Sequence, residues 1–221
     1  LMALILSRLE RQDQLNKREV QMTQLSKDAE LAQLRQQLQP HFLFNSLNSI
    51  NALVITQPKK AREMILLLSD FLRGTIRKDT QSWVSLSDEL NYLKMYLDIE
   101  RVRFGHRLEV EFEMDENCLT QKIPQLLIQP LLENAIKHGI GKQVEGGQIT
   151  ITSNEDVGVY TLRVINSGIL QMQDGHEGFG LQSTRSRLKL LFGDKASFTI
   201  EATKNNIVEA KIIMPVQGVP A

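Results

Sequence analysis

A histidine that directly follows a proline is the first residue of this sequence with chemical potential. Pro40 and His41 open the segment PHFLFNSLNSI, which otherwise has the composition of a helix. Proline lacks the N–H group that a helix interior needs, so Pro40 predicts a local kink that turns His41 outward. A neutral imidazole is a competent nucleophile at neutral pH, and Asn45, one helical turn later, can supply the hydrogen bond that orients it. The alternative is an ordinary structural histidine.

Two further segments combine polar side chains with glycine. In LLENAIKHG, Asn134 offers an oxygen to Mg²⁺ and Lys137 offers charge to phosphate, while His138 lies on a nearby face of the same helix end. In VINSG, Asn166 and Gly168 end a strand, where they can present an acceptor and bare backbone to a flat ring. The alternatives are polar residues on a solvated helix face in the first segment and a simple β-turn in the second.

A glycine pair precedes the last helical pattern of the chain. Gly178 and Gly180 flank Phe179, and Leu181 continues into the helix. Glycines at a helix N-terminus let backbone N–H groups approach an anion. The spacing fits neither the P-loop nor the dinucleotide-binding fingerprint, so the alternative is a flexible loop before a helix.

The bulk composition excludes several classes of protein. The 221 residues carry 26 basic and 26 acidic side chains, and this neutral balance argues against direct nucleic-acid binding. The single cysteine, Cys118, excludes a disulfide framework within the chain and a cysteine-rich zinc site. The opening LMALIL suggests a fragment cut just after a membrane segment, or a helix start that packs on a partner.

The N-terminal half of the pattern is helical. Residues 1–36 contain neither glycine nor proline and have heptad-like apolar spacing, which predicts a signalling helix that pairs with a copy of itself. Residues 37–80 predict a hairpin of two amphipathic helices that meet at Gln57-Pro58. Because one hairpin buries little, we expect two hairpins to form a dimeric four-helix bundle. The expected apolar stripes are Leu43, Leu47, Ile50 and Val54 in the first helix and Ala61, Ile65, Leu68 and Leu72 in the second.

The composition changes near residue 80, where we place the domain boundary. A helix is expected over residues 83–104 with Ser87 as its N-cap, and another over residues 124–138. Alternation predicts strands at 108–114, 148–153, 159–166, 197–202 and 207–214, with a helix at 181–192 before the last pair. This mixture predicts an α+β fold in which residues 81–221 form a sandwich of one sheet faced by helices.

Taken together and in this order, the segments resemble the sensor histidine kinases of the LytS/YehU type. PHFLFNSLNSI is similar to the phospho-acceptor motif of that family, and WVSLSDELNYLKMYLDIERVRFG is similar to its connecting helix. IPQLLIQPLLENAIKHG is similar to the asparagine box, and GFGLQSTRSRLKLLFG to the second glycine box. The resemblance covers residues 31–215 and implies a helical dimerisation domain followed by a Bergerat-type ATP-binding domain.

The resemblance also implies a role for each site residue. His41 would be phosphorylated from ATP, Asn134 would coordinate Mg²⁺, and Lys137 and His138 would contact phosphates. The remaining members of the implied ATP site are Asn166 and Gly168 at the adenine, and Gly178, Gly180 and Leu181 at the lid over the triphosphate.

Two positions depart from the common pattern of this superfamily. Asn166 occupies the place of an aspartate that accepts from the adenine amino group, and an amide accepts that bond without a charge. Charge-assisted hydrogen bonds are roughly twice as strong as neutral ones, so weak ATP binding is expected. No acidic residue follows His41, which leaves the general base unassigned, with Glu133 as a candidate.

The resemblance predicts a membrane-anchored sensor kinase whose cytoplasmic portion includes this chain. The predicted partners are a second copy and a response regulator of the LytTR DNA-binding type, whose aspartate would receive the phosphoryl group. Two alternatives stay open, a dimeric scaffold with little or no catalytic activity and a non-kinase ATPase of the same superfamily.

Overall fold

The computed structural model describes residues 40–77, 83–170, 179–203 and 206–216. The expected N-terminal helix over residues 1–36, the expected domain boundary near residue 80 and Gly178 lie outside these residues. The predicted kink at Pro40 is not tested, because the residues before Pro40 are outside the described part of the chain.

The first described unit is a helical hairpin, as the sequence predicts. Helix α2 (Pro40–Thr56) and helix α3 (Pro58–Arg77) are separated only by Gln57. Helix α3 begins with Pro58, and proline is favoured at the first helical position because its missing N–H has no intrahelical partner there. The backbone N–H of Gln57 donates to Leu53 O at 2.7 Å, which closes the last turn of α2.

The helix expected over residues 83–104 starts later than predicted. Trp83–Ser85 forms a short strand, β1, and helix α4 spans Leu86–Phe104. Ser85, and not the predicted Ser87, is the N-cap, because its hydroxyl oxygen accepts from the backbone N–H of Asp88 at 3.1 Å. The antiparallel pairing of β1 with strand β3 (Lys122–Pro124) draws these residues out of the helix.

The five-stranded sheet has the order β2-β4-β5-β7-β6. Strands β2 and β4 are parallel, whereas the other neighbours are antiparallel. The strands begin and end within a few residues of the predicted positions. They are β2 (Leu108–Met114), β4 (Gly147–Asp156), β5 (Val159–Ser167), β6 (Ser197–Thr203) and β7 (Ile207–Pro215).

The helix expected over residues 124–138 is wrong in its first part. Helix α5 spans only Gln129–Asn134 and continues into a π-helical turn, η3 (Ala135–Gly139), and a 3₁₀ turn, η4 (Ile140–Lys142). The segment before α5 turns because the buried carboxylate of Glu89 accepts from the backbone N–H groups of Leu126 and Ile128, at 2.9 and 3.3 Å. Sequence periodicity could not reveal a bond that α4 makes with this turn.

The remaining elements are short, apart from the last helix. Helix α6 (Phe179–Phe192) precedes β6 and agrees with the helix predicted at 181–192. The described 3₁₀ turns not yet named are η1 (Gly105–Arg107), η2 (Glu116–Cys118) and η5 (Gly193–Lys195).

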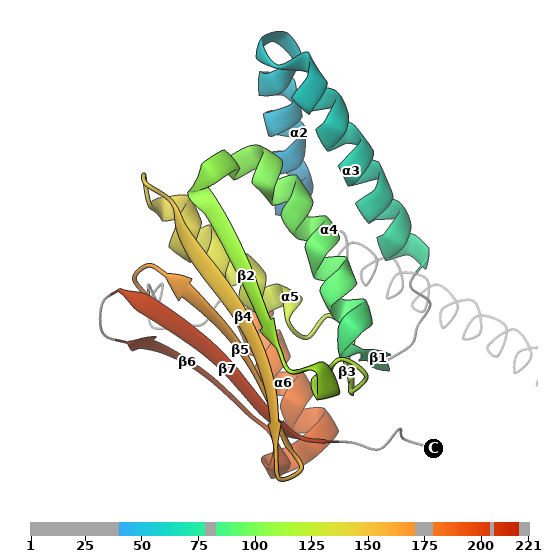
Figure 1. The fold of residues 1–221 in the computed structure, drawn as a ribbon, viewed down its shortest axis with the longest axis vertical. Helices are drawn as coiled ribbons and strands as arrows, with labels where there is room; N and C mark the ends of the chain where they lie inside the picture. Colours follow the sequence, from blue (N-terminus) through green and yellow to red (C-terminus); the bar gives the residue numbers. More distant parts are fainter. Residues whose placement is uncertain (1–39, 78–82, 171–178, 204–205, 217–221) are drawn as a thin grey trace, which may run out of the picture.

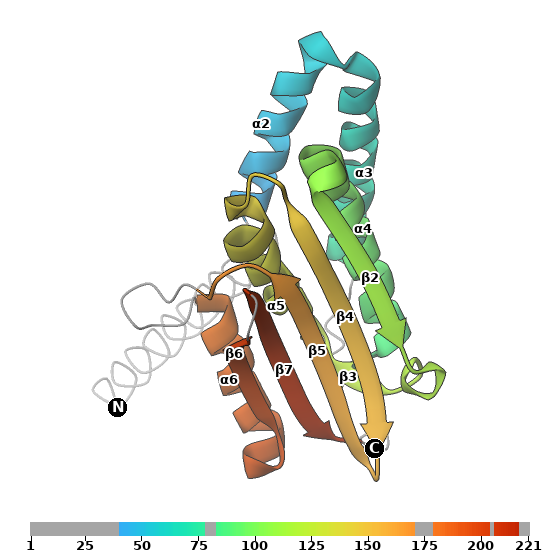
Figure 2. The same ribbon diagram turned by 60° about the vertical axis from the view of Figure 1, so that its left-hand side comes forward.

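The sheet buries one face, and the core lies between this face and the helices. Alternate residues of its strands are buried, which is the pattern of a sheet covered on one side. Figures 1 and 2 show α4, α5 and α6 along the sheet and the hairpin of α2 and α3 standing beside α4. The α+β sandwich predicted for this part of the chain, the architecture expected of a Bergerat-type domain, is therefore confirmed. The buried strand residues include Ile149, Ile151, Leu162, Val164, Phe198, Ile200, Val208, Ala210 and Ile212.

An aromatic cluster fixes the hairpin against α4. The ring of Phe42 lies 5.2 Å from Phe71 and 4.9 Å from Tyr96, and Phe71 stacks on Tyr92 at 5.1 Å. Such aromatic pairs stabilise contacts beyond their buried area. Because Phe42 follows His41 directly, the cluster sets the position of His41 relative to α4.

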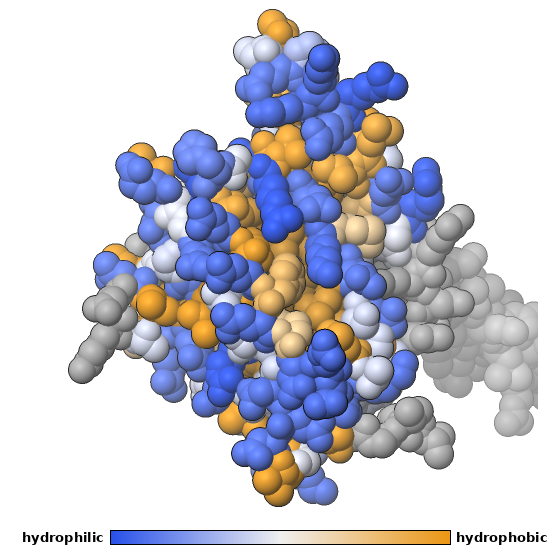
Figure 3. Space-filling model, viewed as in Figure 1, coloured by the Kyte–Doolittle hydropathy of each residue, from blue (hydrophilic) through white to orange (hydrophobic). Residues whose placement is uncertain are grey.

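The hairpin also exposes apolar side chains. Figure 3 shows apolar residues gathered over the hairpin and in a band between α4 and β2. Among the described helices, none is long and apolar enough to span a membrane. The apolar stripe predicted for α2 is buried only in part, since Ile50 is buried but Leu47 and Val54 are 54% and 51% exposed. The other exposed apolar side chains of the hairpin are Phe44, Ile55, Ile65 and Leu66.

Candidate functional site

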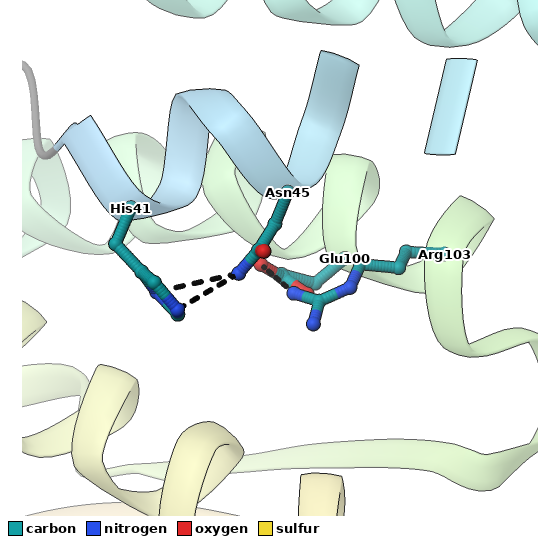
Figure 4. Close-up of polar contacts among 4 residues, drawn as sticks. All are labelled: His41, Asn45, Glu100 and Arg103. Atoms are coloured by element: carbon teal, nitrogen blue, oxygen red, sulfur yellow. Dashed lines mark hydrogen bonds and ion pairs between the residues drawn. The ribbon is translucent and has the colours of Figure 1, made fainter. Parts of the chain in front are cut away.

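His41 is an exposed residue of α2, next to Pro40, and its ring contacts Asn45. The amide nitrogen of Asn45 lies 3.3 Å from His41 Nδ1 and 3.4 Å from Nε2 (Figure 4). The contact joins residues one turn apart, as the sequence predicts. It orients the imidazole while leaving the ring open to a reacting group.

A pocket of about 340 Å³ lies between His41 and the end of α5. It gathers residues from three parts of the chain that are far apart in sequence, and it combines acidic, basic and nucleophilic side chains. Perturbed or paired ionisable groups that share a cleft are typical of functional sites. Its lining residues are His41, Phe42 and Asn45 from α2, Tyr96, Glu100, Arg103 and Phe104 from α4, and Glu133, Ile136, Lys137 and Gly141 from the segment around η3.

An ion pair on α4 forms one wall of this pocket. Arg103 Nη1 donates to both carboxylate oxygens of Glu100, at 3.1 and 3.3 Å. The Glu100 side chain is only 3% exposed, and burial raises the pKa of its carboxyl group, while Arg103 and Tyr96 oppose this shift. Neither residue of this pair stands out in the sequence as a site residue, although their i,i+3 spacing on a helix is recognisable.

The end of α5 carries the three residues predicted to face Mg²⁺ and phosphate. Asn134 ends α5, and Lys137 and His138 lie in the π-helical turn η3. π-Helical turns within helices are rare and frequent at functional sites. His138 Nδ1 is buried and has no hydrogen-bond partner among the described residues. Burial, reinforced by Lys137 and Lys142, lowers the pKa of His138 below its usual value.

Asn166 meets this helix end at the C-terminal end of β5. Its side chain is nearly buried, and Nδ2 donates to Ser167 O at 2.9 Å, which leaves Oδ1 as the acceptor of the amide. A Cβ atom at Gly139 would lie 2.3 Å from Asn166 Nδ2, and one at Gly168 would lie 2.9 Å from Gly139 Cα. Gly168 also has φ +140°, which side chains rarely adopt. The glycines therefore allow β5 and η3 to approach closely, and this contact of Gly139 and Gly168 beside Asn166 is the glycine cradle.

Gln143 is a candidate that the sequence does not reveal. Its Nε2 atom is buried without a partner in the described part of the chain, and it lies 3.2 Å from where a Cβ of Gly168 would be. A buried amide donor beside Asn166 can serve a ring acceptor, since buried polar atoms are rarely left unpaired. No motif singles out Gln143, because only the fold brings η4 to the end of β5.

The glycine-box residues fall at the start of α6. Gly180 is exposed, and its carbonyl oxygen accepts from Thr184 Oγ1 at 3.1 Å. Leu181 is 5% exposed and belongs to the core, so only its backbone is available to a ligand. In the same helix, Arg187 donates to Gln125 O and thereby ties α6 to the turn before α5.

An exposed histidine, a polar pocket and a glycine-lined contact at the C-terminal end of β5 are the features expected of a histidine kinase, and comparison with known proteins assigns the chain to this class. A sequence-family model described as "Histidine kinase" matches residues 29–108. More distantly, a solved structure titled as the catalytic domain of histidine kinase ThkA has a TM-score of 0.49 at 20% identity, covering 62% of this chain and 97% of that one.

Relatives of known name narrow the class. "Sensor protein LytS" of Enterococcus faecalis is 33% identical over 203 residues, 86% of this chain and 34% of that protein. "Sensor histidine kinase BtsS" of Escherichia coli K12 is 30% identical, over 85% and 33% respectively. "Sensor histidine kinase/phosphatase LytS" of Staphylococcus aureus (strain MRSA252) is 31% identical, over 83% and 34%. The chain belongs to the LytS-type sensor histidine kinase family and spans about a third of the length of these relatives.

Proposed function

We propose that this chain is the kinase core of a two-component sensor and that it phosphorylates its own His41 from ATP. The observation that carries the proposal is the shared pocket, because it holds His41 on one side and Glu133 and Lys137 on the other. Glu133 and Lys137 flank Asn134 on the turn that also meets the Asn166 cradle. A nucleotide held in the cradle would have its phosphates near this turn, within the part of the fold that faces His41.

The residues present fit a nucleotide. Gly139 and Gly168 let η3 pack closely on the end of β5, which places Asn166 beside this turn, and the Asn166 amide oxygen can accept from an exocyclic amino group. The buried Nδ1 of His138 and Nε2 of Gln143 are positioned as donors without partners among the described residues. Mg²⁺ would be held by Asn134 together with the phosphates, and it would neutralise their charge.

The transfer balances with the groups at hand. The lone pair of one His41 ring nitrogen attacks the γ-phosphorus, an N–P bond forms, and the P–O bond to the β-phosphate breaks as ADP leaves with its electrons. Asn45 holds the ring during this attack. The proton on the other ring nitrogen must then leave, and Glu133 is the candidate to accept it because its carboxylate lines the pocket of His41.

The proposal includes partners that act through this site. We infer a homodimer from the exposed apolar residues of the hairpin, and we propose that a response regulator with a LytTR-type DNA-binding domain receives the phosphoryl group. A membrane-anchored sensor region of the whole protein would control the core, which would then work on the cytoplasmic side.

The test is phosphate retention on the purified chain with Mg²⁺ and γ-labelled ATP. We expect an acid-labile, base-stable label that His41→Gln and Asn134→Ala both abolish. His106→Gln and Asn91→Ala are matched controls, because both residues are exposed and lie outside the pocket, and they should label like the parent chain.

The same experiment separates the alternatives. A folded chain that binds no nucleotide at millimolar concentration would favour a signalling scaffold. The uncharged Asn166 is the reason to test this alternative, because a neutral acceptor weakens ATP binding. ATP hydrolysis without label on His41 would favour a non-kinase ATPase.

A further inference from the structure

Arg103 is the cation that α4 contributes to the pocket of His41. A guanidinium group has five N–H donors, and Glu100 engages only those of Nη1. Nε and Nη2 have no hydrogen-bond partner among the residues that the structure describes, and the side chain is 29% exposed. The edge formed by Nε and Nη2 is therefore available to a ligand.

Two contacts hold the guanidinium in place. Glu100 anchors Nη1, and the ring of Phe104 packs under the guanidinium at 4.7 Å from its centroid. Figure 4 shows the Arg103 side chain reaching from α4 toward Asn45, on the side where His41 lies. The Nε–Nη2 edge of an arginine matches two oxygens of a phosphate group, and an edge fixed in advance loses little entropy on binding.

We propose that Arg103 binds the phosphoryl group during its transfer to His41 and on the phosphorylated histidine, with Glu100 as its positioning residue. This inference rests on the proposed function of His41. In a loose phosphoryl-transfer transition state, charge spreads over the equatorial oxygens, and a pre-positioned arginine stabilises it. Lys137 lines the same pocket from the opposite element, so the group in transit would lie between cations.

The competing explanation is that Glu100 and Arg103 form only a structural ion pair. Helix α4 itself offers the comparison, because Arg101 makes the same i,i+3 contact with Asp98, at 3.3 Å. Arg101 lines a different pocket, formed with α3. A structural ion pair predicts similar effects of both arginines, whereas the proposal predicts an effect of Arg103 alone.

The first arm of the experiment measures labelling rate and nucleotide affinity on the full chain. We expect Arg103→Ala to slow labelling of His41 by about 100-fold or more, the range seen when one charge-stabilising donor is lost. The ATP dissociation constant should stay nearly unchanged, because the contact forms at the transferred group. Arg103→Lys should restore part of the rate, Glu100→Gln should lower it less than Arg103→Ala, and Arg101→Ala should label like the parent chain.

The second arm does not require kinase activity. Phosphoramidate phosphorylates histidine directly, and ³¹P NMR follows the resulting phosphohistidine, with His41→Gln identifying the resonance of His41. We expect the titration midpoint of that resonance to rise in Arg103→Ala, because a nearby cation favours the dianion. Arg101→Ala should leave the midpoint where it is.

The two arms keep the inference separate from the proposed function. Absence of ATP labelling in the parent chain speaks against the proposed function, and the phosphoramidate midpoints then decide on Arg103. Equal midpoints in the parent chain and Arg103→Ala would overturn the inference, as would labelling that Arg101→Ala slows as much as Arg103→Ala. A weaker ATP affinity in Arg103→Ala with an unchanged labelling rate at saturating ATP would overturn it too, because the arginine would then act on binding alone.

Discussion

At the scale of single residues, the site contains polar atoms that are buried without a hydrogen-bond partner among the described residues. His138 Nδ1 and Gln143 Nε2 are such atoms; Gln143 Nε2 lies beside Gly168, and His138 directly precedes Gly139 in the chain. An unpaired buried donor is unfavourable in the free chain, and a ligand that accepts from it recovers this loss. The site thus gives up some stability to gain ligand affinity.

His138 predicts a pH dependence of stability. Its pKa is lowered in the folded chain, so around its usual value of about 6.5 the unfolded chain binds more protons. Stability should therefore be lost as the pH falls below about 6.5, and His138→Gln should flatten this part of the profile. Urea unfolding at several pH values between about pH 5 and pH 7 measures the free energy of unfolding for both chains.

His106→Gln is the control, since His106 is exposed. It should keep the parent profile. If the free energy of unfolding of the parent chain and of His138→Gln changed in parallel with pH over this range, the inference that folding lowers the pKa of His138 would be wrong.

At the scale of elements, α4 organises the site from both of its ends. Its first turn is capped by Ser85, and its buried Glu89 holds the turn that leads into α5. Its C-terminal half carries Glu100 and Arg103, and its middle bears the aromatic contacts to the hairpin. One helix therefore relates His41 to the turn η3 that follows α5.

The cap of α4 can be tested by a matched pair of substitutions. Ser85→Ala should lower the free energy of unfolding by about 1 kcal/mol, because the N–H of Asp88 loses its acceptor. Ser87→Ala, two residues on, should change it by less than about 0.5 kcal/mol. Denaturant titration compares the two, and a larger loss for Ser87→Ala would restore the cap that the sequence predicts.

At the scale of the whole molecule, the exposed face of the hairpin implies a second copy. Six apolar side chains on α2 and α3 are 47% to 89% exposed, and apolar side chains gathered on a protein surface mark interaction sites. Two such faces can cover each other in a four-helix bundle. The hairpin thus has two apolar surfaces: one packs on α4 in the same chain, and the exposed one is expected to pack on the second copy.

The dimer predicts the behaviour of Leu47→Glu. Leu47 is 54% exposed in the chain, so the substitution should leave the fold intact but place a charge in the interface. Light scattering coupled to size-exclusion chromatography should show a dimer for the parent chain and at least about a tenfold weaker dimer for the variant.

Val157→Glu serves as the control, because Val157 is 94% exposed at the turn between β4 and β5, away from the hairpin. It should dimerise like the parent chain. A parent chain that stays monomeric, or a Leu47→Glu dimer of unchanged affinity, would rule out this face as the interface.

The sequence by itself determined the order of elements and the segments that carry chemistry. Local periodicity is enough to predict the hairpin, the strands and α6, because it reflects which side of each element is buried. Spacing along a helix also sufficed to predict the contact of Asn45 with His41. The assignment of roles to His41, Asn134 and Asn166 rests on motif resemblance and stays a prediction.

Only the tertiary structure decided which distant residues meet. Arg103 joins His41 because the aromatic cluster sets α2 on α4, and Gln143 joins Asn166 because glycines let η3 approach β5. The same reason explains the two errors at element ends, since β1 is drawn out of α4 by β3 and the turn before α5 is held by Glu89. Such contacts depend on the packing of segments far apart in the chain, which local sequence patterns do not encode.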